Sequence, residues 1–510
     1  MSLKTVDEYV ESVKNRKPMN VWFKGQKIED PIKEPALQAS FNTIKKLYEL
    51  TNNPEYADIL TTHSALIDEQ VSFYLSPLLK REDAIQKTRM ARLLAEIFGC
   101  CSHRCTGSEA IGGLYPFTYD VDQKFGTNYH QNLKNWIIHC QQNDLAVAAA
   151  LTDPKGDRKK KPQDQPVPDL YLRVKEKRAD GIVVEGAKVN QTGTIFTHEV
   201  AIIPTSAFTE EGKEYVVAGA IPADTEGLIY VLGRTPFDMR ICEDEEEMID
   251  FGKKYADHQA MLIFEDVFIP NDRIFFCEEW QMSGLLLEYF TAIHRLTAGA
   301  CKAGGMSLLL GATTLSANHL GIERFSHVRG KLTEMAMNAE TLYALSLSAG
   351  YEGFQHESGA WVPNSLLAHT AKYNSTNLPF HGVRLARELL SGWGETAPSI
   401  KDLNQAEIGP KIQKYYTPYA QEGVSAEDRL RAVRLVENLV RGTNWTSMAL
   451  HGGGNSEAAR LMAMRHVDWK KLITLAEAIC GIEQDDEEAI KKIAERSGKI
   501  DLGPKAFKVK

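Results

Sequence analysis

Three cysteines and a histidine lie within seven residues of this 510-residue chain, in the segment GCCSHRC at 99–105. The whole chain has eight cysteines, so thiols are concentrated here. Cys101 and Cys105 are four residues apart and would share one face of a helix, with Cys100 pointing elsewhere. Clustered thiols in a chain this long suit metal binding or catalysis better than a disulfide framework. The segment therefore indicates half of a metal site.

His294 and Cys301, in IHRLTAGACKAG, can supply the other half. Seven residues is nearly two helical turns, so both side chains would share a face, roughly 10 Å apart along the axis. That separation is long for two ligands of one small ion, and it suits ligands that reach different corners of a cluster. Three thiolates and an imidazole are compatible with an iron–sulfur cluster. A zinc ion and purely structural buried cysteines are the two alternatives.

The elements that must position these residues change in character along the chain. Residues 1–135 carry apolar residues at spacings of three and four, which indicates helices. Residues 136–278 contain short β-branched runs separated by Gly and Pro, which is typical of strands and turns. From 279 to 510 the helical pattern returns. We therefore predict an α+β fold with an N-terminal helical domain, a middle β domain and a C-terminal helical bundle.

Composition and charge exclude some partners. The formal net charge is -9, which argues against general nucleic-acid binding. No apolar stretch reaches the ~18 residues that a membrane span needs, and the N-terminus has no apolar signal region. We therefore expect a cytoplasmic protein without a nucleic-acid or membrane partner.

Four stretches in order, together with the ligand pattern, resemble the 4-hydroxyphenylacetate hydroxylase/4-hydroxybutyryl-CoA dehydratase family. The stretches are LTDPKGDR (151–158), RADGIVVEGAKVNQTGTIFTHEVAIIPT (178–205), AMLIFEDVFIPNDRIF (260–275) and HGGGNSEAARL (451–461). Members of this family are flavoproteins with the acyl-CoA dehydrogenase architecture, and the resemblance covers nearly the whole chain. The hydroxylase branch lacks a cluster, whereas the dehydratase branch has one, with the signature CxxxC followed far downstream by HxxxxxxC.

The resemblance implies two cofactors and their ligands. The cluster signature corresponds to Cys101, Cys105, His294 and Cys301, which implies a 4Fe-4S cluster, and Lys302 follows the last ligand as in the dehydratases. FAD is the second cofactor, and the family's flavin contacts correspond to Thr152, Asp153, Thr192, Gly193, Gly453, Asn455 and Ser456. Because the glycine-rich loop at 451–457 reaches flavin on a neighbouring subunit in the family, a homotetramer is also implied.

The implied activity is the radical dehydration of an acyl-CoA substrate, 4-hydroxybutyryl-CoA, to crotonyl-CoA, with vinylacetyl-CoA isomerase activity and oxygen sensitivity. A thioester acidifies only the C2 proton, so the C3 proton becomes labile only after a base has taken the C2 proton and FAD has removed one electron, which it returns once hydroxide has left. Iron would bind the leaving hydroxyl as a Lewis acid. His294 would be a ligand and a base, and Glu457 the other base. The structural alternatives are a purely ligating His294 and a Glu457 that only caps a helix.

Two positions depart from the dehydratase pattern. Ala298 stands where a tyrosine precedes the last cysteine ligand by three residues, and Gln259 stands near a family glutamate. Both differences remove polar groups near the flavin. They leave open a related flavoprotein that acts on another hydroxyacyl-CoA, isomerase-only activity, or a paralogue with weakened catalysis. A flavin-dependent aromatic hydroxylase is a further alternative, which the four ligands argue against.

Overall fold

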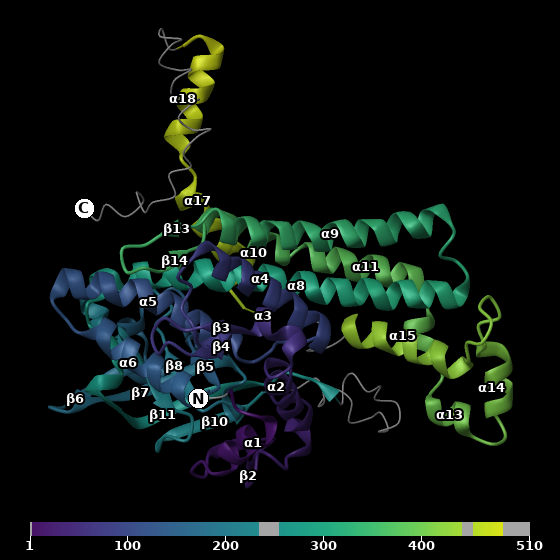
Figure 1. The fold of residues 1–510 in the computed structure, drawn as a ribbon, viewed down its shortest axis with the longest axis horizontal. Helices are drawn as coiled ribbons and strands as arrows, with labels where there is room; N and C mark the ends of the chain where they lie inside the picture. Colours follow the sequence, from purple (N-terminus) through teal and green to yellow (C-terminus); the bar gives the residue numbers. More distant parts are fainter. Residues whose placement is uncertain (1–2, 234–253, 441–451, 483–510) are drawn as a thin grey trace.

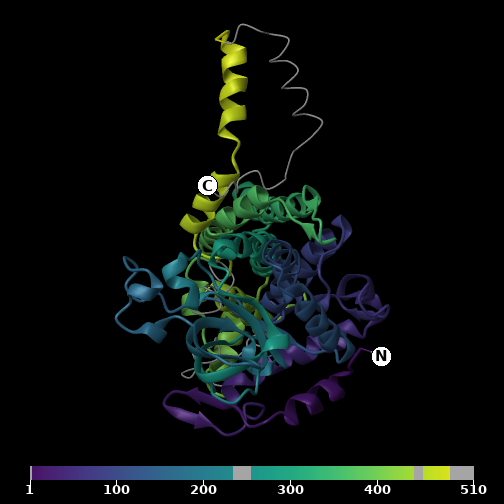
Figure 2. The ribbon, with the colours of Figure 1, turned by 90° about the vertical axis from the view of Figure 1, so that its left-hand side faces the viewer.

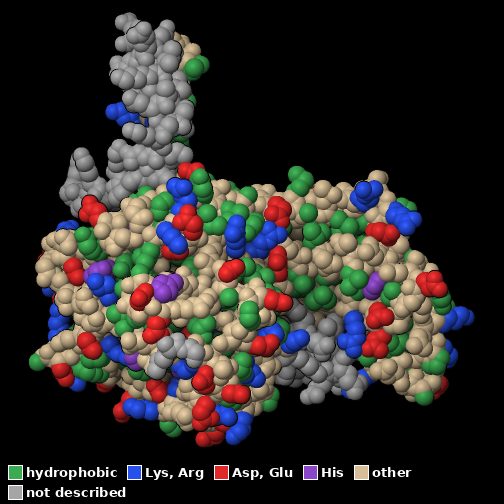
Figure 3. All heavy atoms as spheres, viewed as in Figure 1, with side chains coloured by type: hydrophobic (Ala, Val, Ile, Leu, Met, Phe, Trp, Pro, Cys, Tyr) green, Lys and Arg blue, Asp and Glu red, His purple; other side chains and the backbone are tan. Residues whose placement is uncertain are grey.

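The computed structural model describes residues 3–233, 254–440 and 452–482, and within them the predicted order of helices, strands and helices is confirmed. Figure 1 shows the β layer beside the N-terminal helices, with a bundle of long helices extending past both. Acidic and basic side chains are interspersed on the face of the molecule in Figure 3. No helix in these ranges is long and apolar enough to cross a membrane.

The N-terminal part is helical but also contributes strands to the middle of the molecule. Its helices are α1 (Val6–Lys14), α2 (Gln38–Thr51), α3 (Ala57–Leu60), α4 (Arg81–Phe98), α5 (Cys105–Phe125) and α6 (Tyr129–Gln142). Its strands are β1 (Asn20–Phe23), β2 (Gln26–Ile28), β3 (Thr61–His63) and β4 (Gln70–Ser72). Lys24 and Gly25 join β1 to β2 with φ of 50° and 79°, as a two-residue hairpin turn requires. Since α6 crosses residue 135, a domain boundary there stays a prediction.

Two sheets form the middle of the protein. Their remaining strands are β5 (Val147–Ala150), β6 (Arg173–Lys177), β7 (Gly181–Thr192), β8 (Glu199–Ile202), β9 (Val217–Pro222), β10 (Leu228–Leu232), β11 (Gln259–Pro270) and β12 (Ile274–Cys277). The larger sheet has the order β2-β1-β10-β11-β7-β6, and the smaller has the order β12-β9-β8-β5. In β11 the register to β7 shifts between Phe264 and Val267, where Asp266 has a φ of 54°, so a β-bulge bends this long strand.

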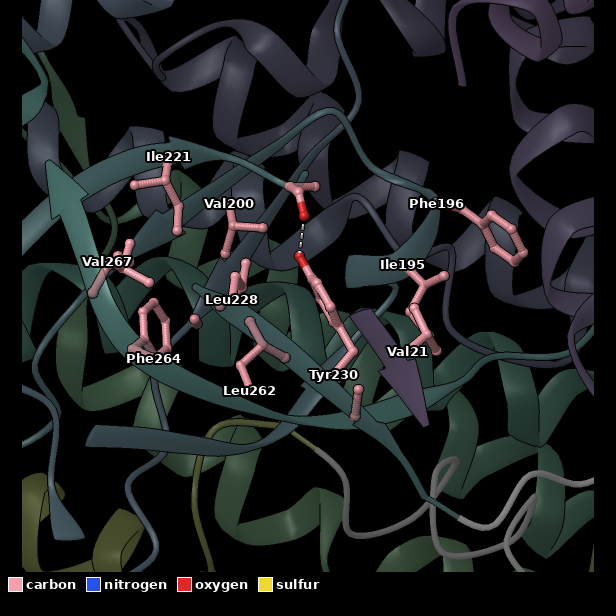
Figure 4. Packing of buried hydrophobic residues seen from close by; sticks show 14 of the residues in the cluster. Val21, Ile195, Phe196, Val200, Ile221, Leu228, Tyr230, Leu262, Phe264 and Val267 are labelled. Carbon is pink, nitrogen blue, oxygen red and sulfur yellow. Dashed lines mark hydrogen bonds between the residues drawn. The ribbon is translucent and has the colours of Figure 1, made fainter. Parts of the chain in front are cut away.

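Apolar side chains of both sheets meet in one core layer, which Figure 4 shows from close by. Val200 and Ile221 come from the smaller sheet, and Leu228 and Leu262 from the larger one. The hydroxyl of the fully buried Tyr230 donates a hydrogen bond to the carbonyl of Ala223 at 2.7 Å. This bond satisfies the one polar group that the tyrosine brings into the core.

The C-terminal part is a helical bundle built around α8 (Ser283–Leu320). Its other elements are α9 (Ser326–Tyr351), β13 (Phe354–Gln355), β14 (Trp361–Val362), α10 (Ser365–Ser375), α11 (Leu378–Leu390), α12 (Trp393–Thr396), α13 (Ile400–Asn404), α14 (Gly409–Tyr416), α15 (Ala426–Val440), α17 (Ser456–His466) and α18 (Trp469–Cys480). Helix α8 packs against α4, α5, α9 and α10. A Cβ on Gly304 would lie 2.4 Å from the carbonyl oxygen of Arg92 on α4, and one on Gly299 would lie 2.3 Å from Oγ of Ser346 on α9. Glycine at both positions therefore lets α8 approach its neighbours closely.

Candidate metal centre

The segment GCCSHRC connects two helices. Helix α4 ends at Gly99, whose φ of 59° is the left-handed conformation that often terminates helices, and α5 begins at Cys105. The expectation that Cys101 and Cys105 share a helix face is therefore wrong, because Cys101 lies in the connection. The connection nevertheless brings the two Sγ atoms to 3.4 Å from each other. Cys100 is buried in the core beside α4, and its thiol faces the carbonyl of Cys101.

All four predicted ligands line one pocket. His294 and Cys301 lie on α8, and they line one pocket together with Cys101 and Cys105. The same wall includes Lys87, Glu109, Ala298, Lys302 and Gly452. Helices α4 and α5 both pack on α8, which explains how donors almost two hundred residues apart in the sequence meet.

The four predicted ligands do not form the compact site that a single ion needs. Among the described residues, the group of three donors whose ligand atoms all lie within 4.8 Å of one another is Glu288, His369 and His466, which lies outside this pocket. A tetrahedral zinc ion with bonds of about 2.0–2.3 Å needs its ligands at least that close. The types of donor, three thiols and an imidazole, therefore favour an iron–sulfur cluster, and their spacing does not.

Glu109 orients His294, and sequence reasoning did not identify it. It lies one helical turn after Cys105 on α5, is fully buried, and its Oε2 accepts a hydrogen bond from Nδ1 of His294. A carboxylate that accepts from Nδ1–H leaves Nε2 as the nitrogen available to a metal ion, a common arrangement for metal-bound histidines. Nε2 faces the glycine turn, since a Cβ on Gly452 would lie 3.1 Å from it. The i,i+4 spacing from Cys105 was the signal that could have revealed Glu109.

Buried cations accompany the thiols. Nζ of Lys302 lies 3.6 Å from Sγ of Cys301, and Nζ of Lys87 donates to Oγ of Ser108 at 2.7 Å. Burial lowers the pKa of Lys87, and the nearby Glu109 opposes this shift. Ammonium groups in this position would offset the negative charge of a cluster with three thiolate ligands. The soft donors and the cations beside them therefore fit an iron–sulfur cluster.

Two of these thiols, those of Cys105 and Cys301, favour the protonated form. The contact with Cys101 and burial together raise the pKa of Cys105 well above its ordinary value. Burial also raises the pKa of Cys301, and Lys302 opposes this shift. Metal binding must therefore displace protons from these thiols.

Thr192 and Gly193, two predicted flavin contacts, lie at the end of β7. Oγ1 of Thr192 donates to Oε1 of Gln259 at 2.8 Å. Gly193 has a φ of 77°, and a Cβ on it would lie 2.6 Å from Cβ of His103. Glycine is therefore required here because the segment that joins α4 to α5, to which His103 belongs, lies against Gly193. The strand end predicted to bind flavin and the segment that carries the thiols are in direct contact.

Thr152 and Asp153, the other two contacts predicted in the β region, are tied to the same strand. Asp153 is buried, and it accepts hydrogen bonds from Nζ of Lys188 at 2.6 Å and Oγ1 of Thr205 at 2.7 Å. Lys188 belongs to β7, four residues before Thr192. The buried ion pair therefore fixes the 151–153 segment to the strand that ends at Thr192 and Gly193.

The glycine-rich loop leads into α17. Asn455 caps this helix by accepting a hydrogen bond from the backbone N–H of Ala458 at 2.8 Å, and Ser456 is its first residue. Glu457 follows in the first turn, is exposed, and forms an ion pair with Arg460 at 2.6 Å. Within one chain, therefore, Glu457 does not reach the pocket, and this geometry fits the role of a first-turn acid.

Gly453, by contrast, is buried, and its carbonyl accepts a hydrogen bond from Nε of Arg295 at 3.0 Å. Ala298 is also buried and contributes only a methyl group to the pocket wall. The turn before α17 thus closes over α8 next to His294.

Comparisons of the sequence with known proteins agree with this arrangement. The family models described as 4-hydroxyphenylacetate 3-hydroxylase N terminal and C terminal match residues 5–276 and 283–481. The chain is 38% identical to a 4-hydroxybutyryl-CoA dehydratase/vinylacetyl-CoA-Delta-isomerase of Clostridium aminobutyricum, over 94% of this chain and 100% of that protein. It is 28% identical to a 4-hydroxyphenylacetate 3-monooxygenase oxygenase component of Thermus thermophilus, over 85% and 87% of the two chains.

Solved structures agree as well. An oxygen-tolerant archaeal 4-hydroxybutyryl-CoA dehydratase from N. maritimus matches with a TM-score of 0.90 and 32% identity, over 96% of this chain and 99% of that one. A glutaryl-coenzyme A dehydrogenase in complex with glutaryl-CoA matches with a TM-score of 0.53 and 12% identity, over 90% and 93% of the two chains. The second likeness concerns the fold alone, and with the first it confirms the predicted acyl-CoA dehydrogenase-like architecture.

Proposed function

Because the chain belongs to the 4-hydroxyphenylacetate 3-hydroxylase family, we propose that it is a hydro-lyase that converts 4-hydroxybutyryl-CoA to crotonyl-CoA. We propose also that it isomerises vinylacetyl-CoA, and that it uses FAD and a 4Fe-4S cluster. The observation that carries this proposal is the convergence of Cys101, Cys105, Cys301 and His294 on one pocket. An aromatic hydroxylase of this family would not need such a set of donors.

Each side chain of the pocket has a role in this proposal. When bound, the cluster would supply a Lewis acid for the leaving hydroxyl, and FAD would supply one-electron redox chemistry. The three cysteines would anchor the cluster, and Nε2 of His294 would complete the ligand set. Because Glu109 holds Nδ1, Nε2 stays directed into the pocket, and it would accept a proton from the substrate only after the substrate had displaced it from the iron. Lys87 and Lys302 would balance the charge of the thiolates.

The flavin is proposed to lie along Thr152, Asp153, Thr192 and Gly193. A neighbouring subunit would add Gly453, Asn455, Ser456 and Glu457. Two observations support the second group: Asn455 and Glu457 are exposed, and they stand at the N-terminus of α17, where free backbone N–H groups favour a negatively charged ligand. In this arrangement Glu457 is the second base, and it acts in the site of a neighbour.

Helix α18 supports assembly into a homotetramer. It projects from the body of the chain (Figures 1 and 2). Trp469, Ile473 and Ile479 on this helix are 56%, 57% and 78% exposed. An isolated helix of 12 residues gains little stability by itself, and exposed apolar side chains of this size normally lie in an interface. We therefore propose that another copy of the chain covers α18.

The test is purification without oxygen, followed by iron, sulfide and flavin analysis and an assay on 4-hydroxybutyryl-CoA and vinylacetyl-CoA. We expect a brown protein with about four irons and one FAD per chain, which air bleaches slowly. Cys301→Ala should lose most of the iron. The matched control, Cys277→Ala, removes a half-buried thiol outside the pocket and should keep it. A colourless protein with one zinc, or an iron-free protein that hydroxylates phenols with oxygen, would refute the proposal.

A further inference from the structure

Next to His294, buried charged side chains from three helices meet. Glu288 and Arg295 lie on α8, His369 on α10 and His466 on α17. Oε1 of Glu288 lies 3.3 Å from Nε2 of His369 and 2.8 Å from Nε2 of His466. Glu288, Arg295 and His369 are 5%, 2% and 0% exposed. Burial of so many polar groups is costly unless each has a partner, so their pairing is informative.

One carboxylate and two imidazoles at these distances resemble a metal site, but Arg295 argues against one. Its Nη1 lies 2.8 Å from Nδ1 of His369. Because a guanidinium only donates hydrogen bonds, Nδ1 of His369 is the acceptor, and the ring proton of the neutral imidazole lies on Nε2, toward Glu288. A metal ion at Nε2 would have to displace this proton beside the positive charge of Arg295.

With the protons so placed, Arg295 donates a hydrogen bond to His369. Nε2 of His369 and Nε2 of His466 both lie close to Oε1 of Glu288, but neither has hydrogen-bond geometry toward it. Burial tends to raise the pKa of Glu288, but the imidazoles of His369 and His466 beside it outweigh this effect and hold the pKa below its ordinary value. Glu288 is therefore ionised, and its charge compensates that of Arg295 across a neutral ring.

Arg295 also holds the glycine turn at 452–454 and the helix that follows. Besides the bond from its Nε to the carbonyl of Gly453, its Nη1 lies 3.2 Å from Sδ of Met462 on α17. The three glycines have φ of 80°, 73° and 78°, which other residues rarely adopt. Gly452 contacts the Nε2 side of His294. One guanidinium thus connects α10, α17 and the turn that covers the candidate ligand.

We propose that Arg295 is a positioning residue that holds the 452–454 turn over Nε2 of His294. His369 accepts a hydrogen bond from its guanidinium, and Glu288 places a negative charge beside the imidazoles of His369 and His466. The turn then limits how closely a substrate oxygen, or an oxidant, approaches the iron that His294 binds. The inference rests on the proposed function in treating His294 as an iron ligand, whereas the link between Arg295 and the turn does not depend on it.

The test uses Arg295→Lys, which keeps the positive charge but has no planar guanidinium to contact both His369 and Gly453. The matched control is Arg460→Lys, which changes an exposed arginine of α17. A charge-balanced double variant, Arg295→Met with Glu288→Gln, removes the pair without leaving a buried charge. Amide hydrogen exchange of the peptide 452–466 is measured in all three. We expect exchange about tenfold faster in the Arg295 variants, the change that loss of one charged hydrogen bond gives. The control should be unchanged.

Two further measurements concern function. In substrate-free Arg295→Lys, the cluster should bleach in air about tenfold faster at equal initial iron content, and the KM for the acyl-CoA should change more than kcat. A purely structural role would lower active protein without changing these values. Unchanged exchange and bleaching in Arg295→Lys would overturn the inference. The inference would also be overturned if the wild-type protein bound one equivalent of zinc and His466→Gln did not.

Failure of the two proposals can be told apart. If the wild-type protein contains no iron, the proposed function fails, but hydrogen exchange still tests whether Arg295 holds the turn. If the wild type contains iron and dehydrates its substrate while Arg295→Lys exchanges like the wild type, only the positioning role is wrong.

Discussion

Replacement of Glu109 tests whether His294 is an oriented ligand or simply a nearby histidine. In Glu109→Ala, Nδ1 of His294 loses its acceptor, so a buried N–H is left without a partner and the ring is free to rotate or to change tautomer. Glu109→Gln keeps an amide oxygen at nearly the same place and therefore keeps one acceptor, without the charge.

The expected magnitude follows from the position of Glu109. Loss of the outer partner of a metal-bound histidine costs about 10–100-fold in metal affinity or activity, or about 1.4–2.7 kcal/mol. Glu109 is 0% exposed, so water cannot replace it. We therefore expect about a 100-fold loss of dehydration in Glu109→Ala, and about a tenfold loss in Glu109→Gln.

The assay combines iron content, turnover and pulsed electron paramagnetic resonance of the reduced cluster with 15N-labelled histidine. The imidazole coupling should weaken or become heterogeneous in Glu109→Ala and persist in Glu109→Gln. Glu96→Ala, which removes a partner of Arg92 on the surface of α4, is the control for loss of a glutamate. If Glu109→Ala keeps both the wild-type coupling and turnover within about twofold, the argument that Glu109 fixes the ligand is wrong.

Three further predictions concern other parts of the molecule. His294→Cys should keep the cluster colour, since a thiolate can hold iron, but should lose dehydration by about 100-fold or more because no imidazole remains to accept a proton; near-normal turnover would make His294 a passive ligand. Ile473→Asp with Ile479→Asp should yield smaller species than a homotetramer in light scattering, and an unchanged mass would exclude α18 from the interface. Burial holds the pKa of His258 well below its ordinary value. The unfolded chain therefore binds a proton at this residue more readily than the folded protein does. As a result, the free energy of unfolding falls as the pH drops below about 6.5, by up to about 1.4 kcal/mol per pH unit. His258→Gln should reduce the pH dependence of the free energy of unfolding between pH 5 and 7, and an identical slope would contradict this reasoning.

The sequence was sufficient to predict the order of the layers. The four residues that meet in the pocket were predicted from their spacing together with the family resemblance, and their binding of a metal stays a prediction. Three cysteines and a histidine in two short segments are chemically specific, and side-chain type does not depend on the local conformation. The conformation of the first segment was predicted wrongly. A spacing of four residues is compatible with a helix or with a turn that enters one, and here Gly99 ends α4 before Cys101 is reached.

Other features were not predictable because they depend on contacts between distant segments. Glu109 acquires its role only from His294, which is 185 residues away in the sequence. Gly193 was predicted only as a flavin contact, yet its requirement for glycine arises from His103. The strands at 20–28 lie in a region of helical pattern, and they form because β10 offers them a free edge to pair with.

The close packing of α8 on its neighbouring helices restricts how the sequences of proteins with this architecture can diverge. Gly299 lies between His294 and Cys301, and the contacts of Gly299 and Gly304 leave no room for α8 to slide against α9 or α4. Mutations can therefore hardly change the distance between these two ligands without disrupting the bundle. Ala298 can be exchanged for another side chain while the helices stay where they are, since it faces the pocket. A new preference for acyl chain length would thus be acquired by altering this wall, with the proposed metal ligands inherited unchanged.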